Sequence, residues 1–271
     1  YYLIKYIEKL FCRLLILFNI YPKTQFYFDS NIKNVSNYNN SFIRKFAKKT
    51  SLSNILLNFQ IVENINSRSV ENYKKNKLKR EKPGILFIDG NYKHQDALTR
   101  EGKNILINKK KYIESVRKYL KYLGEIFDLN ISIALHPSSN LKEYRKLFPK
   151  FKIKKNNTLE QIYNSSIIIF HESSSVIDAF LAKKKIIAFQ TKMLGNYIFN
   201  RINLYINKGN LFYINIDEPI NNGYLTKNQI LKQIKLKEKK LNEFINTYVK
   251  SDSQMLPSEK IIKTIENYKL K

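Results

Sequence analysis

From residue 84 onward, short apolar runs alternate with longer segments that have apolar residues at helical spacing. The apolar runs have strand length, and they are expected at residues 85–90, 131–135, 151–155, 167–170, 185–191 and 211–216. Between and after them, helices are predicted at residues 110–124, 141–148, 176–182, 194–209, from 226 to about 250, and from about 258. This alternation predicts an α/β domain with a mainly parallel, Rossmann-like sheet.

Three of the predicted helix starts carry the capping-box pattern, in which two side chains satisfy free backbone N–H groups. The pairs are Thr158 with Gln161, Ser175 with Asp178, and Thr226 with Gln229. At Ser175 the box offers an explanation of the local sequence that needs no ligand.

The pattern is less regular in residues 1–80. Residues 1–22 form an amphipathic pattern in which Lys5, Lys9 and Arg13 share one face. We interpret it as a helix packed on a domain, with attachment to an anionic membrane as the alternative. A strand is expected near residues 25–28 and a helix near 41–49.

A polar, charge-rich connector precedes Pro83 and Gly84 and separates two parts of the chain. We therefore divide the chain into a partial N-terminal α/β or helical domain at residues 1–80, the Rossmann-like domain at 81–250, and a C-terminal helix at 251–271. The chain begins with Tyr1 rather than Met, so truncation would explain the short N-terminal part.

Composition adds a strong positive charge to this picture. The 271 residues include 49 Lys and Arg against 22 Asp and Glu, a formal net charge of +27. Part of this excess reflects the Lys-, Asn- and Ile-rich composition of an AT-rich genome. The remainder favours an anionic partner, such as a phosphate-bearing substrate or an anionic membrane face. Nucleic acid is disfavoured, because the basic residues are spread along the whole chain.

The single cysteine, Cys12, cannot form an internal disulfide, which favours a reducing compartment and hence the cytoplasm. No stretch reaches the ~18 uncharged apolar residues of a membrane-spanning helix.

Candidate chemistry is concentrated just after the strand predicted at residues 167–170. There His171, Glu172, Ser173, Ser174 and Ser175 lie between the strand and the following helix. A strand–turn–helix junction of this kind directs backbone N–H groups and hydroxyls at one point, which suits a phosphate.

The other polar residues of interest follow other strands. The histidines His94, His136 and His171 each come after a predicted strand, as do Ser138 and Ser139, Asp89 and Asp96. Ligands of open α/β sheets bind outside the carboxyl ends of the strands, so we expect one site at this edge.

Several familiar motifs are absent from the sequence. There is no GxGxxG, no GxxxxGK[ST], no HExxH and no GxSxG. The sequence therefore favours a phosphate or diphosphate ligand held by serines and histidine, without a metal or a bound cofactor.

His136-Pro137, followed by the serine cluster and the KKIIAF strand, resembles the donor-binding half of GT-B glycosyltransferases. The resemblance is greatest to bacterial sialyltransferases and Kdo transferases of capsule and lipopolysaccharide assembly, and it covers roughly residues 84–216. It implies that His136, Pro137 and Ser138 contact the phosphate of a nucleotide-sugar donor. It also implies that residues 171–175 hold that phosphate. Residues 1–80 lack the acidic motif that such enzymes carry.

The sequence and the resemblance together lead us to expect an inverting, metal-independent glycosyltransferase acting on a bacterial surface glycan. Asp96 and Asp89 are the candidates for the base, and His136 would stabilise the leaving phosphate. The nucleotide-sugar would be a substrate, and the protein would be cytoplasmic, with possible peripheral contact to the inner membrane. The alternatives are a polyol-phosphate transferase of the CDP-glycerol type and a non-catalytic basic module for nucleic acid or acidic glycan.

Overall fold

The computed structural model describes residues 26–29, 61–64, 69–70, 83–90, 109–220, 225–250 and 255–269. The chain divides into two compact units. One contains residues 1–71 together with 246–271, and the other contains residues 72–245. The residues at the C-terminal end thus group with the N-terminal residues, whereas the sequence suggested a separate terminal helix.

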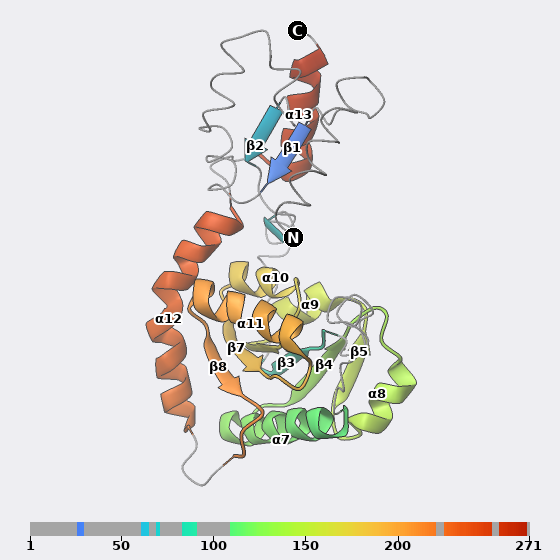
Figure 1. The fold of residues 1–271 in the computed structure, drawn as a ribbon. Helices are drawn as coiled ribbons and strands as arrows, with labels where there is room; N and C mark the ends of the chain where they lie inside the picture. The colour runs from blue at the N-terminus through green and yellow to red at the C-terminus, as the bar shows by residue number, and fades with distance from the viewer. Residues whose placement is uncertain are drawn as a thin grey trace, which may run out of the picture. The chain divides into compact units, whose positions relative to one another are not determined.

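The larger unit is built on a six-stranded sheet in which all neighbouring strands are parallel (Figure 1). Its strands are β3 (Ile85–Ile88), β4 (Ile131–Leu135), β5 (Lys152–Lys155), β6 (Ile167–Phe170), β7 (Lys185–Gln190) and β8 (Phe212–Asn215). The predicted α/β class and parallel, Rossmann-like sheet are confirmed.

The strands lie in the spatial order β5-β4-β3-β6-β7-β8. Counted from β3 as the first strand of this sheet, the order is 3-2-1-4-5-6, which is the Rossmann arrangement. The chain winds outward from β3 in one direction and then returns to begin β6 on its other side. The boundary between β3 and β6 is therefore the topological switch point, where ligands of such sheets bind.

Helices cover both faces of this sheet, which explains why its inner strands are apolar throughout (Figure 1). The helices are α7 (Lys109–Phe127), α8 (Leu141–Leu147), α9 (Thr158–Tyr163), α10 (Val176–Leu181), α11 (Asn196–Gly209) and α12 (Lys227–Tyr248). Helix α7 packs on one face, and α9, α10 and α11 pack on the other.

The core on the α7 face follows directly from the sequence pattern. Ile113, Val116, Leu120 and Leu123 are all buried, as their helical spacing predicts. They pack against Ile85 and Phe87 of β3 and against the same face of the neighbouring strands. Burial of this apolar surface, at about 25 cal/mol per Å², is the main force that holds α7 to the sheet.

The three capping boxes have different outcomes. At α12 the box forms as predicted: Thr226 N donates to Gln229 Oε1 at 2.7 Å, and Gln229 N donates to Thr226 Oγ1 at 3.4 Å. At α9 the prediction is wrong, because Asn157 occupies the cap position in a left-handed conformation. At α10 it is also wrong, since Ser175 has helical backbone angles and makes no side-chain cap.

The smaller unit is described only in part. Strands β1 (Phe26–Asp29) and β2 (Ile61–Asn64) form a parallel pair, and helix α13 (Pro257–Lys269) belongs to the same unit. The strand expected near residues 25–28 is confirmed by β1. The helices expected at residues 1–22 and 41–49 lie outside the described residues.

No helix among the described residues is both long enough and apolar enough to cross a membrane.

Gly90, which follows β3, fills a position where a side chain does not fit. A Cβ atom there would lie 2.0 Å from the carbonyl oxygen of Glu172 and 3.2 Å from Nε2 of His171. Gly84, at the other end of the same strand, would place its Cβ 3.6 Å from the Asn130 carbonyl oxygen, which is an ordinary contact.

We predict that Gly90→Ala destabilises the protein by roughly 2–3 kcal/mol, because the ends of β3 and β6 must separate to admit the methyl group. Gly84→Ala is the matched control and should change the free energy of unfolding by less than about 1 kcal/mol. Urea unfolding of the two variants checks this, and equal losses would contradict the predicted close packing.

Candidate functional site

The polar residues predicted to form a site come from three adjacent strands at the carboxyl edge of the sheet. Asp89 and Gly90 follow β3, and His171 follows β6, its neighbour in the sheet. His136 follows β4, on the other side of β3. The ends of β4 and β6 are two strand spacings apart, roughly 10 Å. The structure therefore brings His136 and His171 to one edge, while His94 and Asp96 lie outside the described residues.

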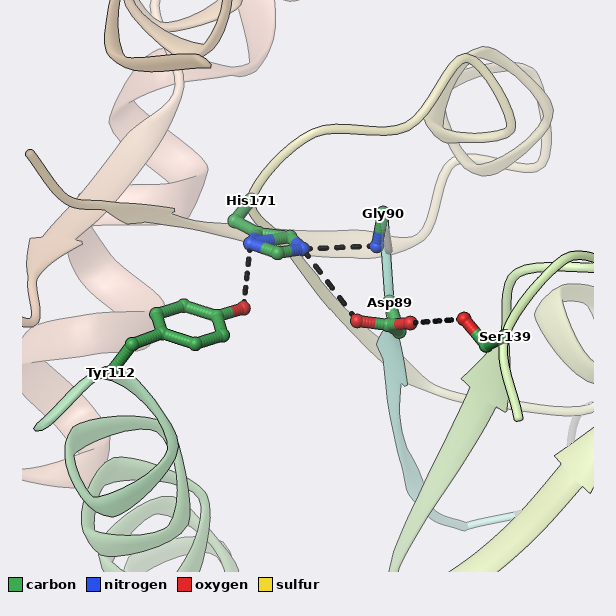
Figure 2. Close-up of polar contacts among 5 residues, drawn as sticks. All are labelled: Asp89, Gly90, Tyr112, Ser139 and His171. Atoms are coloured by element: carbon green, nitrogen blue, oxygen red, sulfur yellow. Dashed lines mark hydrogen bonds and ion pairs between the residues drawn. The ribbon is translucent and has the colours of Figure 1, made fainter. Parts of the chain in front are cut away.

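His171 lies at the switch point and is only 2% exposed. Its Nε2 accepts a hydrogen bond from the Gly90 backbone N–H at 2.9 Å, and its Nδ1 lies 2.9 Å from the hydroxyl of Tyr112 on α7 (Figure 2). The Tyr112 and His171 rings stack with an interplanar angle of 11°. Because Nε2 accepts, the proton of the neutral ring is on Nδ1 and is donated to Tyr112.

Burial lowers the pKa of His171 from 6.5 to about 4. The Asp89 carboxylate lies 4.0 Å from Nε2 and would favour a charged ring. The Gly90 N–H nevertheless points at that same nitrogen, so the neutral ring fits the hydrogen bonds that are present. His171 thus joins β3, β6 and α7 from the interior, and it would affect a ligand by holding the Gly90 and Glu172 backbone in place.

Asp89, predicted as a candidate base, is also buried, with 3% of its surface exposed. Its Oδ2 accepts a hydrogen bond from Ser139 Oγ at 3.2 Å (Figure 2). Ser139 is itself buried, and its carbonyl accepts a hydrogen bond from the exposed Lys155 side chain at 2.9 Å. The carboxylate therefore connects β3 to the loop after β4, inside the edge of the sheet.

Tyr144 on α8 is close to this carboxylate. Its pKa is raised, first by burial and then by the negative charge of Asp89. The Tyr144 hydroxyl therefore stays neutral near Asp89 over the physiological pH range.

His136 is half-buried, and Pro137 and Ser138 are exposed. Nδ1 of His136 lies 2.7 Å from Ser138 Oγ and accepts the Ser138 backbone N–H at 3.2 Å. In the neutral ring, the proton is consequently on Nε2. His136 is therefore a partly accessible histidine whose ring is oriented by Ser138.

The serine cluster differs from the predicted cradle in its backbone. The N–H groups of Val176, Ile177 and Asp178 donate to the carbonyls of Ser173, Ser174 and Ser175, respectively, in a tight turn. These three N–H groups are therefore already used within the turn, and α10 has only six residues. The N–H groups that start α10 are thus bonded within the turn, whereas the sequence predicted that they would be directed at a ligand.

The serine side chains remain at the surface. Ser174 is exposed, Ser173 and Ser175 are half-buried, and Ser173 Oγ accepts the Ser175 N–H at 3.3 Å. Glu172, placed by the sequence among the phosphate-binding residues, instead forms an ion pair with Arg201 of α11 at 3.0 Å. The carboxylate is neutralised there, which lowers its repulsion toward an anionic ligand at the same edge.

Sequence reasoning did not assign Tyr112, Arg201 or Lys155 to this region. Tyr112 follows the core spacing of α7, so nothing in its position distinguished it from a packing residue. Arg201 and Lys155 are basic residues in a chain that has 49 of them. They differ from the other basic residues in their contacts: Arg201 pairs with Glu172, and Lys155 donates to the Ser139 carbonyl.

Among the residues that the structure describes, no three His, Cys, Asp or Glu side chains are close enough together to hold a metal ion.

A large hollow, about 1610 Å³, lies mainly toward the opposite edge of the sheet, although Lys155 also lines it. It is lined by residues at the amino-terminal ends of β3 and β4, by α7 and by the edge strand β5. The hollow is therefore not lined by the histidines and serines that the sequence predicted to form a site.

Comparisons with solved structures give distant matches. No protein-family model and no curated protein matches the sequence. The UDP-GlcNAc 2-epimerase of Methanocaldococcus jannaschii, solved with UDP-GlcNAc and UDP, is 14% identical, with a TM-score of 0.45. The match covers 82% of this chain and 59% of that protein.

Two glycosyltransferases are also similar at this level. The calicheamicin glycosyltransferase CalG4 is 9% identical with a TM-score of 0.38, over 70% of this chain and 43% of that one. SnogD from Streptomyces nogalater is 12% identical with a TM-score of 0.37, over 70% of this chain and 45% of that one. The chain therefore spans less than two thirds of the length of each of these three proteins.

We predict that His171 makes stability depend on pH. Its pKa is lowered in the folded protein, so between about pH 6.5 and pH 4 the unfolded chain binds a proton that the native protein does not. Stability should therefore fall as pH falls through this window, by up to about 3 kcal/mol, with no further change from this group below pH 4.

The test compares unfolding free energies of the wild type and His171→Gln from pH 7 to pH 4. Glutamine retains an acceptor for the Gly90 N–H but does not titrate. The variant should be less stable at pH 7 and show a shallower loss below pH 6.5. Parallel pH profiles for the two proteins would show that another group is responsible.

Proposed function

We propose that the larger unit binds a nucleotide-activated sugar at the carboxyl edge of its sheet and transfers the sugar to a bacterial surface glycan. The observation that carries the proposal is the placement of His136 and Ser174. His136 is partly accessible and lies in the loop after β4, and Ser174 is exposed and lies in the turn after β6; β4 and β6 flank β3 in a Rossmann-ordered sheet whose switch point lies between β3 and β6. This position is where such sheets bind nucleotides. A fold alone does not establish an activity, so the proposal depends on these side chains.

The chemistry of the edge suits an anionic leaving group. The Ser138 hydroxyl donates to Nδ1 of His136 and orients the ring. Nε2–H of His136 and the hydroxyl of Ser174 are neutral donors, and Lys155 adds a positive charge beside Ser139. In the proposed reaction these groups stabilise the negative charge that develops on the nucleotide phosphate as the glycosidic bond breaks. A metal ion would not be needed for this role, and an inverting, metal-independent mechanism belongs to the proposal as what the resemblance implies.

The base would deprotonate the acceptor hydroxyl. Asp89 is buried and accepts from Ser139, so its position favours a structural role. Asp96 is then the better of the two candidates, and it follows β3 in the sequence. The capsule or lipopolysaccharide setting, the cytoplasmic location and contact with the inner membrane belong to the same proposal and rest on the resemblance and on the positive charge.

A polyol-phosphate transferase is the second candidate, because the same donors would serve a CDP-glycerol-type substrate. The donors at this edge recognise a phosphate and do not select what it carries.

We expect one nucleotide class to raise the melting temperature of the protein by several degrees, since ligand at 100 times its Kd stabilises by about 2.7 kcal/mol. CMP, UDP, GDP and CDP-glycerol are compared, with single-stranded DNA as a polyanion. His136→Ala and Ser174→Ala should abolish the shift.

The control for these variants is Ser132→Ala, near the amino end of β4, the strand that precedes His136. It should keep the full nucleotide-dependent shift. Salt-sensitive stabilisation by every polyanion, unchanged in His136→Ala and Ser174→Ala, would instead identify a basic binding module.

Asp96→Asn separates donor binding from catalysis. Because the base acts on the acceptor, the variant should keep the nucleotide-dependent shift but lose roughly 100-fold or more in transfer rate. Rates are measured as nucleotide released from the stabilising donor in the presence of acceptor glycan. An Asp96→Asn rate equal to that of the wild type would remove Asp96 as the base.

A further inference from the structure

Helix α12 has one buried face and one basic face. Ile230, Phe244 and Ile245 are buried, and Phe244 packs edge-on against the Phe180 ring at 5.8 Å. Leu231 and Ile234 are partly buried against the core. The helix is therefore held against the domain along one side, and its orientation about its own axis is fixed.

The opposite side carries lysines in a regular stripe. Lys232, Lys235 and Lys239 are all exposed and are spaced three and four residues apart, so they share one face of the helix. None of them forms a salt bridge within the described part of the chain. Like charges at this spacing repel one another and destabilise a helix. An anionic partner would remove that repulsion.

An exposed leucine lies within the same stripe. Leu236, between Lys235 and Lys239 along the helix, is 66% exposed, more than any other large hydrophobic residue among those described. The acids nearest to the stripe are Glu238, on the flank of the helix, and Glu243, one turn beyond Lys239. The lysine and leucine positions thus form a continuous patch, residues 232–239 on the outer side of α12, which we call the α12 patch.

The composition of the α12 patch distinguishes between kinds of anionic partner. Surfaces that bind nucleic acid use arginine and aromatic side chains that stack on bases. The exposed side of α12 has lysines but no arginine and no aromatic residue. A leucine among lysines instead matches an anionic lipid surface, where the ammonium groups meet the headgroups and the leucine enters the acyl boundary.

We infer that the α12 patch is a docking surface for anionic phospholipid. The inference is independent of the proposed donor site, because α12 contributes none of the residues assigned to that site. It gives the expected membrane contact a location different from residues 1–22. A few lysines and one leucine provide reversible binding rather than stable anchoring.

The test is co-sedimentation of the full chain with vesicles of phosphatidylcholine, with and without 30% phosphatidylglycerol. The triple variant Lys232→Gln, Lys235→Gln, Lys239→Gln should bind the anionic vesicles more weakly by on the order of 100-fold, at about fivefold per lysine. Leu236→Gln should also weaken binding, and its effect should remain at high salt, where the lysine contribution is screened.

The matched control removes three exposed lysines from α7 and α8: Lys110→Gln, Lys118→Gln and Lys146→Gln. It has the same net charge as the α12 triple variant and should bind vesicles within a few-fold of the wild type. Thermal unfolding verifies that all variants are folded, since every changed side chain is exposed.

Two outcomes would overturn the inference. Equal losses in the two triple variants would show that net charge alone governs binding. Binding to single-stranded DNA that falls with the α12 triple variant, together with no effect of Leu236→Gln on vesicles, would assign the α12 patch to nucleic acid. Neither outcome affects the rise in melting temperature that nucleotide is expected to cause. The donor-site proposal is therefore tested separately.

Discussion

The hydrogen bond from the Gly90 N–H to Nε2 of His171 is the contact on which the arrangement of the switch point depends. It joins the first strand of the sheet to the strand that starts its second half, at the one place where the chain reverses its direction of winding. The absence of a side chain at Gly90 lets the two backbones approach closely enough for this bond. The same bond fixes the tautomer of the ring, and Nδ1–H then donates to the Tyr112 hydroxyl on α7.

This interior network has a consequence for the residues around it. A buried polar group is costly unless its hydrogen bonds are made, so each member fixes the positions of the others. His171 orients the turn that carries the serines, and Asp89 orients Ser139 in the loop that carries His136. The loop that carries His136 and the turn that carries Ser174 are thus each attached to this buried network.

Charge is distributed unevenly over the described part of the molecule. At the carboxyl edge the groups are mainly neutral donors, and Glu172 is neutralised by Arg201. The α12 patch, by contrast, concentrates lysines that form no salt bridge with a described acid. The net charge of +27 is a sum over the whole chain. What a particular surface can bind depends on where the individual lysines lie.

The apolar runs and helical spacing in the sequence determined the α/β class, the parallel strands, and the core residues of α7, because burial on both faces requires continuous apolar strands. They also placed the histidines and serines after the strands. Only the tertiary structure decided which of these side chains are accessible. His171 and His136 follow the same pattern in the sequence, yet one is enclosed by Gly90 and Tyr112, and the other is partly exposed. Burial depends on what packs against a residue from distant parts of the chain, and such long-range contacts leave no periodic signal in the local sequence.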